Sequence, residues 1–188
     1  MTIHEFAHAW IAFRCGDNTA KIMGRLSLNP LVHIDLIGTI VMPLFLFITS
    51  GGRFVFGAAK PVPINYWLLK KPKRDIILIG LAGPSANILT AYIIGLILKF
   101  ITPNNLMNII LSHLAVISLI LGIFNLIPLP PLDGSRIIMG ILPPKLLKIY
   151  NSIEPYGIII LMIAIILGLY DLIIFPIVNI MINIFGLS

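Results

Sequence analysis

The chain has 188 residues, of which 59% are hydrophobic and 11% are charged. Soluble domains typically have about 45–50% apolar and about 25% charged residues, so this composition excludes an ordinary soluble protein and indicates a lipid environment. The net charge is +6. Because the basic residues lie in short loops beside apolar segments, they fit a membrane surface better than a nucleic-acid partner. Cys15 is the single cysteine, which excludes an internal disulfide.

The first apolar segments in chain order are short. Residues 1–14 are predicted to form a helix, and residues 15–36 a polar stretch rich in turns. The apolar run 36–50 is broken by Pro43. At about 1.5 Å per residue, this run reaches only about two thirds of a ~30 Å hydrocarbon core. The run is therefore either re-entrant or spanning, and the distribution of basic residues favours the re-entrant version.

Residues 51–75 are predicted to form a loop that contains glycines and prolines and has a basic end. Within the polar stretches, residues 22–28 and 54–60 could pair as short strands. An exposed edge there could hold an unwound substrate by strand addition. A plain loop fits the same residues at least as well.

Four longer apolar runs follow, and each is predicted to span the membrane. The second and third runs are separated by a proline-rich loop over 130–150. The four runs are residues 75–101, 106–129, 153–170 and 172–187. The predicted fold class is therefore all-α: a polytopic integral membrane protein with a partial first helix, a re-entrant segment and a single membrane-embedded domain over 1–188.

The distribution of basic residues constrains the topology. If residues 36–50 are re-entrant, the loops 14–36, 51–75 and 128–150 lie on one side of the membrane. Those loops contain all 13 Lys and Arg residues except Lys99. The positive-inside rule then predicts that this side is cytoplasmic.

The segment His4-Glu5-Phe6-Ala7-His8 forms an H-E-x-x-H motif. On a helix, residues i and i+4 share one face, so both imidazoles can reach one cation. Glu5 is displaced around the helix, where it can serve as the base that takes a proton from water. Three ionisable residues in an apolar helix are costly unless they are functional. The alternative interpretation is two chance histidines on an amphipathic helix.

A catalytic zinc site needs a third protein ligand and one open position. His33 and His113 are candidates, but Asp133 is the stronger one. Under the re-entrant topology, the helix that contains His8 and the span that ends near Leu129 leave the membrane on the same side, at similar depth. Asp133-Gly134 alone would be interpreted as a turn, whereas the missing ligand favours metal binding.

Asn87 and Asn125 are polar residues within apolar spans. Hydrogen bonding between membrane helices is one interpretation. Substrate positioning or stabilisation of an oxyanion is the other. The sequence favours neither.

Together these segments resemble the site-2 protease family of intramembrane metalloproteases, in its compact prokaryotic branch without an inserted PDZ domain. The resemblance covers residues 2–157 in family order. It rests on His4-Glu5-Phe6-Ala7-His8, Gly24-Arg25-Leu26-Ser27-Leu28-Asn29-Pro30 with His33, Asp35 and Gly38-Thr39, Phe56-Gly57-Ala58-Ala59-Lys60-Pro61-Val62-Pro63, Ala82-Gly83-Pro84-Ser85-Ala86-Asn87, Asn125-Leu126-Ile127-Pro128, Leu132-Asp133-Gly134 and Glu154-Pro155-Tyr156-Gly157.

The resemblance implies a three-helix metalloprotease core, here followed by two C-terminal transmembrane helices. It implies one Zn²⁺ bound by His4, His8 and Asp133, with Glu5 as the catalytic base and Asn125 near the site. The implied substrate is a transmembrane segment that unwinds before it is cleaved. In the family, the motif helix normally begins well before its first histidine, whereas Met1-Thr2-Ile3 precede His4 here. We therefore expect a start that is truncated relative to the family.

The sequence thus predicts an intramembrane zinc metalloprotease that hydrolyses peptide bonds in or near transmembrane segments. The expected partners are a transmembrane protein substrate and the lipid bilayer, with no nucleic acid. The expected location is the prokaryotic cell membrane, with the active site toward the cytoplasm. The alternatives are a catalytically inactive zinc-binding scaffold of the same fold, or a transporter of metal ions or protons.

Overall fold

The computed structural model describes residues 1–49, 51–52, 57, 60–100 and 105–187, without the side chains of residues 46 and 105. Throughout these residues the regular secondary structure is helical, which confirms the all-α prediction. The chain divides into two compact units, Met1–Lys70 and Lys71–Ser188, and each is described by itself. The single domain expected over 1–188 stays a prediction.

The first unit is built around α1 (Thr2–Cys15), which confirms the helix expected at the start of the chain. The helix ends at Gly16, whose φ of 113° is left-handed and allows its N–H to bond the carbonyl of Phe13. Ala9 of α1 packs against Ala20 and Val62 in a small buried cluster. The remaining elements of this unit are α2 (Thr19–Ile22), the 3₁₀ helix η1 (Pro30–His33), the π-helical η2 (Leu36–Val41), α3 (Met42–Thr49) and the 3₁₀ helix η3 (Tyr66–Leu68).

The strand considered over residues 22–28 does not form. Instead α2 ends at Ile22, and Gly24 turns the chain with a φ of 67°. The N–H of Arg25 then bonds the carbonyl of Ala20, so the segment folds back on itself rather than extending. Its proposed partner strand, 54–60, lies largely outside the described residues.

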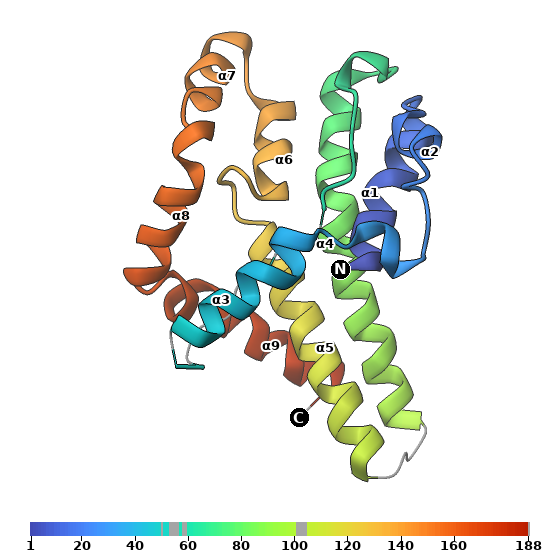
Figure 1. Cartoon of the computed structure of the whole chain (residues 1–188), viewed down its shortest axis with the longest axis vertical. Coiled ribbons are helices and arrows are strands. Elements are labelled where there is room, and N and C mark those ends of the chain that lie inside the picture. Colours follow the sequence, from blue (N-terminus) through green and yellow to red (C-terminus); the bar gives the residue numbers. More distant parts are fainter. Residues whose placement is uncertain (50, 53–56, 58–59, 101–104, 188) are drawn as a thin grey trace. The chain divides into compact units, whose positions relative to one another are not determined.

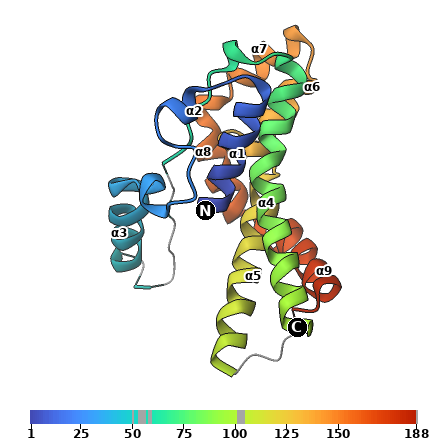
Figure 2. The same cartoon turned by 90° about the vertical axis from the view of Figure 1, so that its right-hand side faces the viewer.

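The second unit contains two long antiparallel helices, α4 (Pro72–Phe100) and α5 (Asn105–Asn125). They run side by side, and α9 (Phe175–Phe185) packs against both (Figures 1 and 2). The core between them contains Ala91, Leu119 and Ile174. The other elements are α6 (Asp133–Ile141), α7 (Pro144–Asn151), the 3₁₀ helix η4 (Glu154–Tyr156), α8 (Gly157–Ile166) and the π-helical η5 (Tyr170–Ile174).

Within the described residues, three helical runs are long and apolar enough to cross a membrane: Pro72–Phe100, Leu106–Asn125 and Pro144–Ile166. The fourth predicted span, 172–187, corresponds to the shorter apolar run Tyr170–Phe185. The prediction of a loop over 130–150 was wrong, because α6 and α7 occupy most of it. Pro144 sits in the first turn of α7, where proline is compatible with a helix because its missing N–H has no partner to lose.

Candidate functional site

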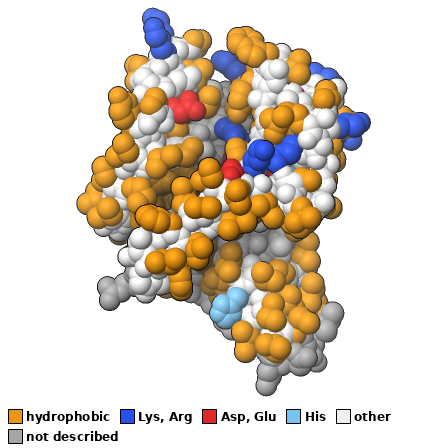
Figure 3. Space-filling view, in the orientation of Figure 1, with side chains coloured by type: hydrophobic (Ala, Val, Ile, Leu, Met, Phe, Trp, Pro, Cys, Tyr) orange, Lys and Arg blue, Asp and Glu red, His pale blue; other side chains and the backbone are white. Residues whose placement is uncertain are grey.

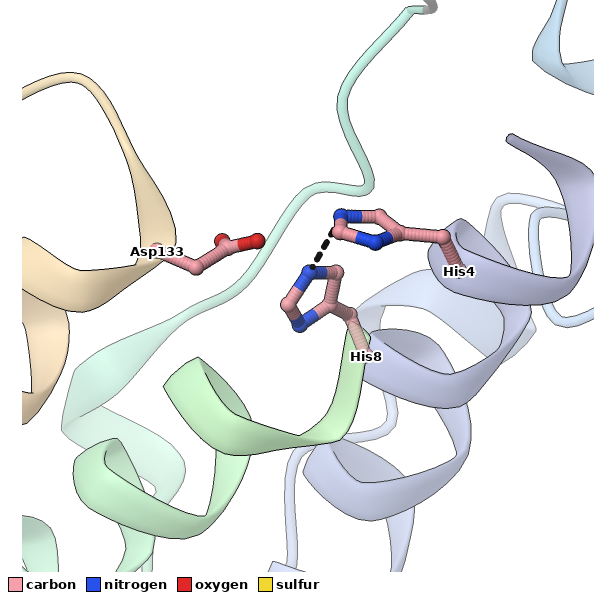
Figure 4. A group of neighbouring side chains, drawn as sticks. All are labelled: His4, His8 and Asp133. Atoms are coloured by element: carbon pink, nitrogen blue, oxygen red, sulfur yellow. Dashed lines mark hydrogen bonds between the residues drawn. The ribbon is translucent and has the colours of Figure 1, made fainter. Parts of the chain in front are cut away.

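The two motif histidines lie one turn apart on α1, and both are buried. Their Nε2 atoms approach to 3.1 Å, with the rings nearly perpendicular at 83° (Figure 4). Two nitrogens of a tetrahedral zinc centre with Zn–N bonds of about 2.0–2.1 Å lie about 3.3 Å apart. The two nitrogens therefore have the spacing of two ligands on one ion. Both histidines belong to the first unit.

Glu5 lies beside the pair, and its carboxylate has a defined backbone partner. The N–H of Val62 donates to its Oε2 at 3.1 Å. Val62 is flanked by Pro61 and Pro63, neither of which has an N–H. The Pro-Val-Pro segment consequently offers one backbone donor, and that donor is directed at Glu5.

The loop that contains Val62 is fixed at both ends. On one side, the guanidinium of Arg25 donates to the carbonyls of Lys60 at 2.9 Å and of Pro61 at 3.3 Å. On the other side, the N–H of Asn65 donates to Oδ2 of the fully buried Asp17 at 2.7 Å. These charge-assisted bonds are stronger than neutral ones, so they hold the Val62 amide in place.

Asp133 begins α6 in the second unit, and its side chain is buried. Oδ1 accepts a hydrogen bond from Arg136 at 3.1 Å, one turn further along the helix. A carboxylate in the first turn is also favoured by the helix dipole. Figure 4 draws this side chain at the start of α6. The side chain thus presents a carboxylate at the start of α6, and carboxylate oxygens are among the ligands that zinc accepts.

Glycines fix the position of α6. A Cβ at Gly134 would lie 2.3 Å from the carbonyl oxygen of Leu126 and 2.4 Å from that of Ile127. A Cβ at Gly80 of α4 would lie 2.9 Å from the carbonyl oxygen of Asp133. Only hydrogen fits at these approaches, so the backbone around Asp133 is packed directly on α4 and on the turn that follows α5.

Three of the other candidate residues, Asn125, His33 and His113, have hydrogen-bond partners close by in the sequence. The Asn125 amide donates to the carbonyl of Leu121 in its own helix at 2.9 Å, and Asn87 is buried in α4. Their roles in substrate positioning stay predictions. His33 places Nε2 2.8 Å from the Ser27 carbonyl, and His113 places Nδ1 2.7 Å from the Ile109 carbonyl.

Sequence reasoning missed the supporting residues Val62, Arg25 and Asp17. The pairing of Val62 with Glu5 joins positions 57 apart in the chain, which no periodic pattern reveals. A weak signal was available, because a proline on each side of one non-proline residue isolates a single N–H donor.

Comparison with known proteins gives consistent matches. The model of peptidase family M50 matches residues 101–169. "Putative zinc metalloprotease YwhC" of Bacillus subtilis is 36% identical over 187 residues, which cover 95% of this chain and 81% of that protein. Two proteins named "Putative zinc metalloprotease Rip2" are similar to 88% and 87% of the chain: that of Mycolicibacterium smegmatis is 29% identical and that of Mycobacterium tuberculosis (strain H37Rv) 28%.

The chain covers 63% and 62% of the length of these two Rip2 proteins. No solved structure gives a significant match.

Proposed function

This chain belongs to the site-2 protease family of intramembrane metalloproteases, peptidase family M50, and on that premise we propose which of its residues carry out the reaction. It is a multi-pass membrane zinc metalloprotease. His4, His8 and Asp133 bind Zn²⁺, and Glu5 serves as the catalytic base. The observation that supports this most directly is the 3.1 Å approach of the two Nε2 atoms on α1.

The donor set fits a catalytic zinc. Two imidazoles and one carboxylate leave a fourth position open, as hydrolytic zinc sites require. When bound, Zn²⁺ supplies Lewis-acid chemistry: it polarises the scissile carbonyl and lowers the pKa of water. With the carboxylates of Asp133 and Glu5 ionised, the charges of the cluster sum to zero, and a neutral cluster is far less costly to bury than a charged one.

Glu5 moves the protons. Its carboxylate takes a proton from the attacking water and later gives it to the nitrogen of the leaving amine. The Val62 N–H engages Oε2, so that oxygen is held in place by the backbone. We assign the transferred proton to Oε1.

The substrate we propose is a transmembrane segment of another membrane protein. The three apolar helical runs are long enough to cross a bilayer, where such segments are the accessible polypeptides, and this supports the choice of substrate. A regular helix shields its carbonyls by internal hydrogen bonds, so the cleaved stretch must unwind first. We further propose the cell membrane as the location, with the site toward the cytoplasm, because the basic loops favour that side.

The test is cleavage of a single-span substrate by the purified chain in detergent, with zinc measured in parallel. We expect a metal chelator to abolish cleavage and added Zn²⁺ to restore it. Glu5→Gln should retain zinc and reduce the rate of cleavage by about 10²- to 10⁴-fold, the usual contribution of a general base. Appreciable proteolysis by Glu5→Gln would exclude this role. Zinc binding by the unmodified chain without any cleavage would instead support the inactive-scaffold alternative.

A further inference from the structure

Arg25 is a buried cation that the described part of the chain surrounds with carbonyls. Its guanidinium donates to the carbonyl of Val32, to that of Lys60 at 2.9 Å and to that of Pro61 at 3.3 Å. Among the described residues, no acidic side chain forms an ion pair with it. Figure 3 shows how sparse acidic side chains are on one face of the molecule, where hydrophobic ones dominate. A buried charge is costly without compensation, and one of the three carbonyls connects Arg25 to a carboxylate.

The Pro61 carbonyl and the Val62 N–H belong to the same peptide group. This group is trans, so its oxygen and its hydrogen point in opposite directions. The oxygen accepts from Arg25, and the N–H donates to Oε2 of Glu5 at 3.1 Å. A single peptide group therefore lies between the guanidinium and the Glu5 carboxylate, with its negative end toward the cation and its positive end toward the anion.

This arrangement couples the two charged side chains. Hydrogen bonds that form a chain polarise one another, and each is electrostatically stronger inside a protein than in water. A cation at the Pro61 oxygen consequently makes the Val62 N–H a stronger donor. The Val62 side chain is buried against Ala9 and Ala20, which opposes rotation of the peptide away from Glu5.

The guanidinium also joins this peptide to a second segment. Nη1 bonds the carbonyl of Val32 in η1, whereas Nη2 bonds those of Lys60 and Pro61. The N–H of Lys60 donates in return to the carbonyl of His33 at 3.0 Å. A planar guanidinium can serve both segments at once, whereas an ammonium has its donors on one atom. Arg25→Lys therefore keeps the charge and loses part of the bridge.

We propose that Arg25 is a positioning residue for Glu5 and acts through the Pro61–Val62 peptide. It orients and polarises this peptide, which then holds the carboxylate in one orientation during proton transfer. The effect on catalysis rests on the proposed function, in which Glu5 is the base. The coupling between Arg25 and Glu5 can be measured without any cleavage.

The sequence allows this one peptide group to be observed directly. Pro61-Val62 is the single Pro-Val pair in the chain. Isotope labels on the carbonyl carbon of proline and the nitrogen of valine therefore give one signal in a carbonyl–amide NMR correlation spectrum of the full chain in detergent. Glu5→Gln removes the charge from the acceptor and should move the Val62 amide proton upfield.

Variants of Arg25 should move the same signal from the other end of the peptide. We expect Arg25→Lys to shift both the Pro61 carbonyl carbon and the Val62 amide proton upfield. Arg25→Gln keeps a planar donor but no charge, and it should shift the amide proton further. Lys21→Gln removes an exposed cation from the same unit. It is the matched control and should leave the signal in place.

Kinetic measurements test the consequence for catalysis. Arg25→Lys should lower kcat by at least about threefold, with KM and zinc content nearly unchanged. In a Val62→Pro background, which lacks the N–H, the same change should alter kcat by less than about twofold. The melting temperature should fall in both backgrounds, because the bonds to Val32 and Lys60 do not depend on that N–H.

Two results would overturn the proposal. One is a Pro61–Val62 signal that neither Arg25→Lys nor Arg25→Gln shifts. The other is an equal loss of kcat from Arg25→Lys with and without Val62→Pro, since it would assign Arg25 to general stability. If the unmodified chain binds zinc but cleaves nothing, the proposed function fails, and the NMR signal still decides whether Arg25 and Glu5 are coupled.

Discussion

At the scale of single residues, the proximity of His4 and His8, the two proposed zinc ligands, is a local consequence of helical spacing. His4 and His8 are separated by one turn, so any regular helix over this segment brings their rings together. The sequence therefore predicted the pair completely, and the structure adds only that Nε2 of each ring is the converging atom. Asp133, the proposed third ligand, is different in kind, because its position depends on a distant part of the chain.

Asp133→Asn tests that third ligand. The change preserves the size of the side chain but removes the negative charge that favours a dication, so we expect the dissociation constant for zinc to rise by at least about tenfold. Zinc content after dialysis against a competing chelator measures it. Asp171→Asn, at an exposed carboxylate outside the proposed site, is the control and should bind zinc normally. An unchanged affinity in Asp133→Asn would remove this residue from the metal site.

Val62→Pro tests the backbone donor to Glu5. The change removes the N–H while keeping an apolar side chain in a segment whose neighbours are already prolines. A hydrogen bond to a charged group contributes about 1.5–3 kcal/mol, so kcat should fall by about 10- to 100-fold with KM and zinc content nearly unchanged.

Val62→Ala keeps the N–H and loses packing in the cluster with Ala9 and Ala20. It should therefore lower the melting temperature more than it lowers kcat. If Val62→Pro and Val62→Ala reduced kcat equally, the amide would have no particular role in positioning Glu5.

At the scale of elements, the sequence predicted long apolar helices well and the proline-rich connection poorly. The span expected over 75–101 is α4, since continuous hydropathy is a strong signal. The stretch 130–150 was assigned to a loop because prolines break helices in their interior. Here they lie before α6 or at the start of α7, where a helix accepts them. Gly134 and Gly80 allow backbones to approach closely around the start of α6. Hydropathy does not identify which segments come together there.

Gly134→Ala tests how closely α6 must approach the turn at Leu126 and Ile127, just after α5. The added Cβ would meet two carbonyl oxygens within 2.4 Å, so the start of α6 must shift and carry Asp133 with it. Overpacking of this kind costs about 1–3 kcal/mol or more. We expect a lower melting temperature together with weaker zinc binding.

Ser135→Ala is the neighbouring control. It removes one hydroxyl that bonds the Leu132 carbonyl at 2.6 Å and adds no atoms. It should retain zinc affinity and lose little stability. Equal zinc binding by Gly134→Ala would show that the close approach of these backbones is unrelated to the metal site.

At the scale of the whole molecule, charge distribution and helix direction agree within the second unit. The start of α4 and the end of α5 share one side of the membrane, because α4 and α5 are antiparallel spans. The start of α7 shares that side, because α6 has only 9 residues and is too short to cross in between. Lys145 lies at the start of the third span, Pro144–Ile166, whereas Lys99 lies at the opposite end of α4. The sequence could predict this because it depends only on counting spans and basic residues.

Cysteine labelling tests the resulting topology. In a Cys15→Ala background, which removes the single native thiol, a membrane-impermeant maleimide should label Lys99→Cys in intact cells. Lys145→Cys should react only after the membrane is permeabilised, because the positive-inside bias places that end in the cytoplasm. Both side chains are exposed, so a position that fails to react with the maleimide would not do so because it is buried. The reverse pattern would invert the orientation, and labelling of both positions from outside would contradict α4 as a full span.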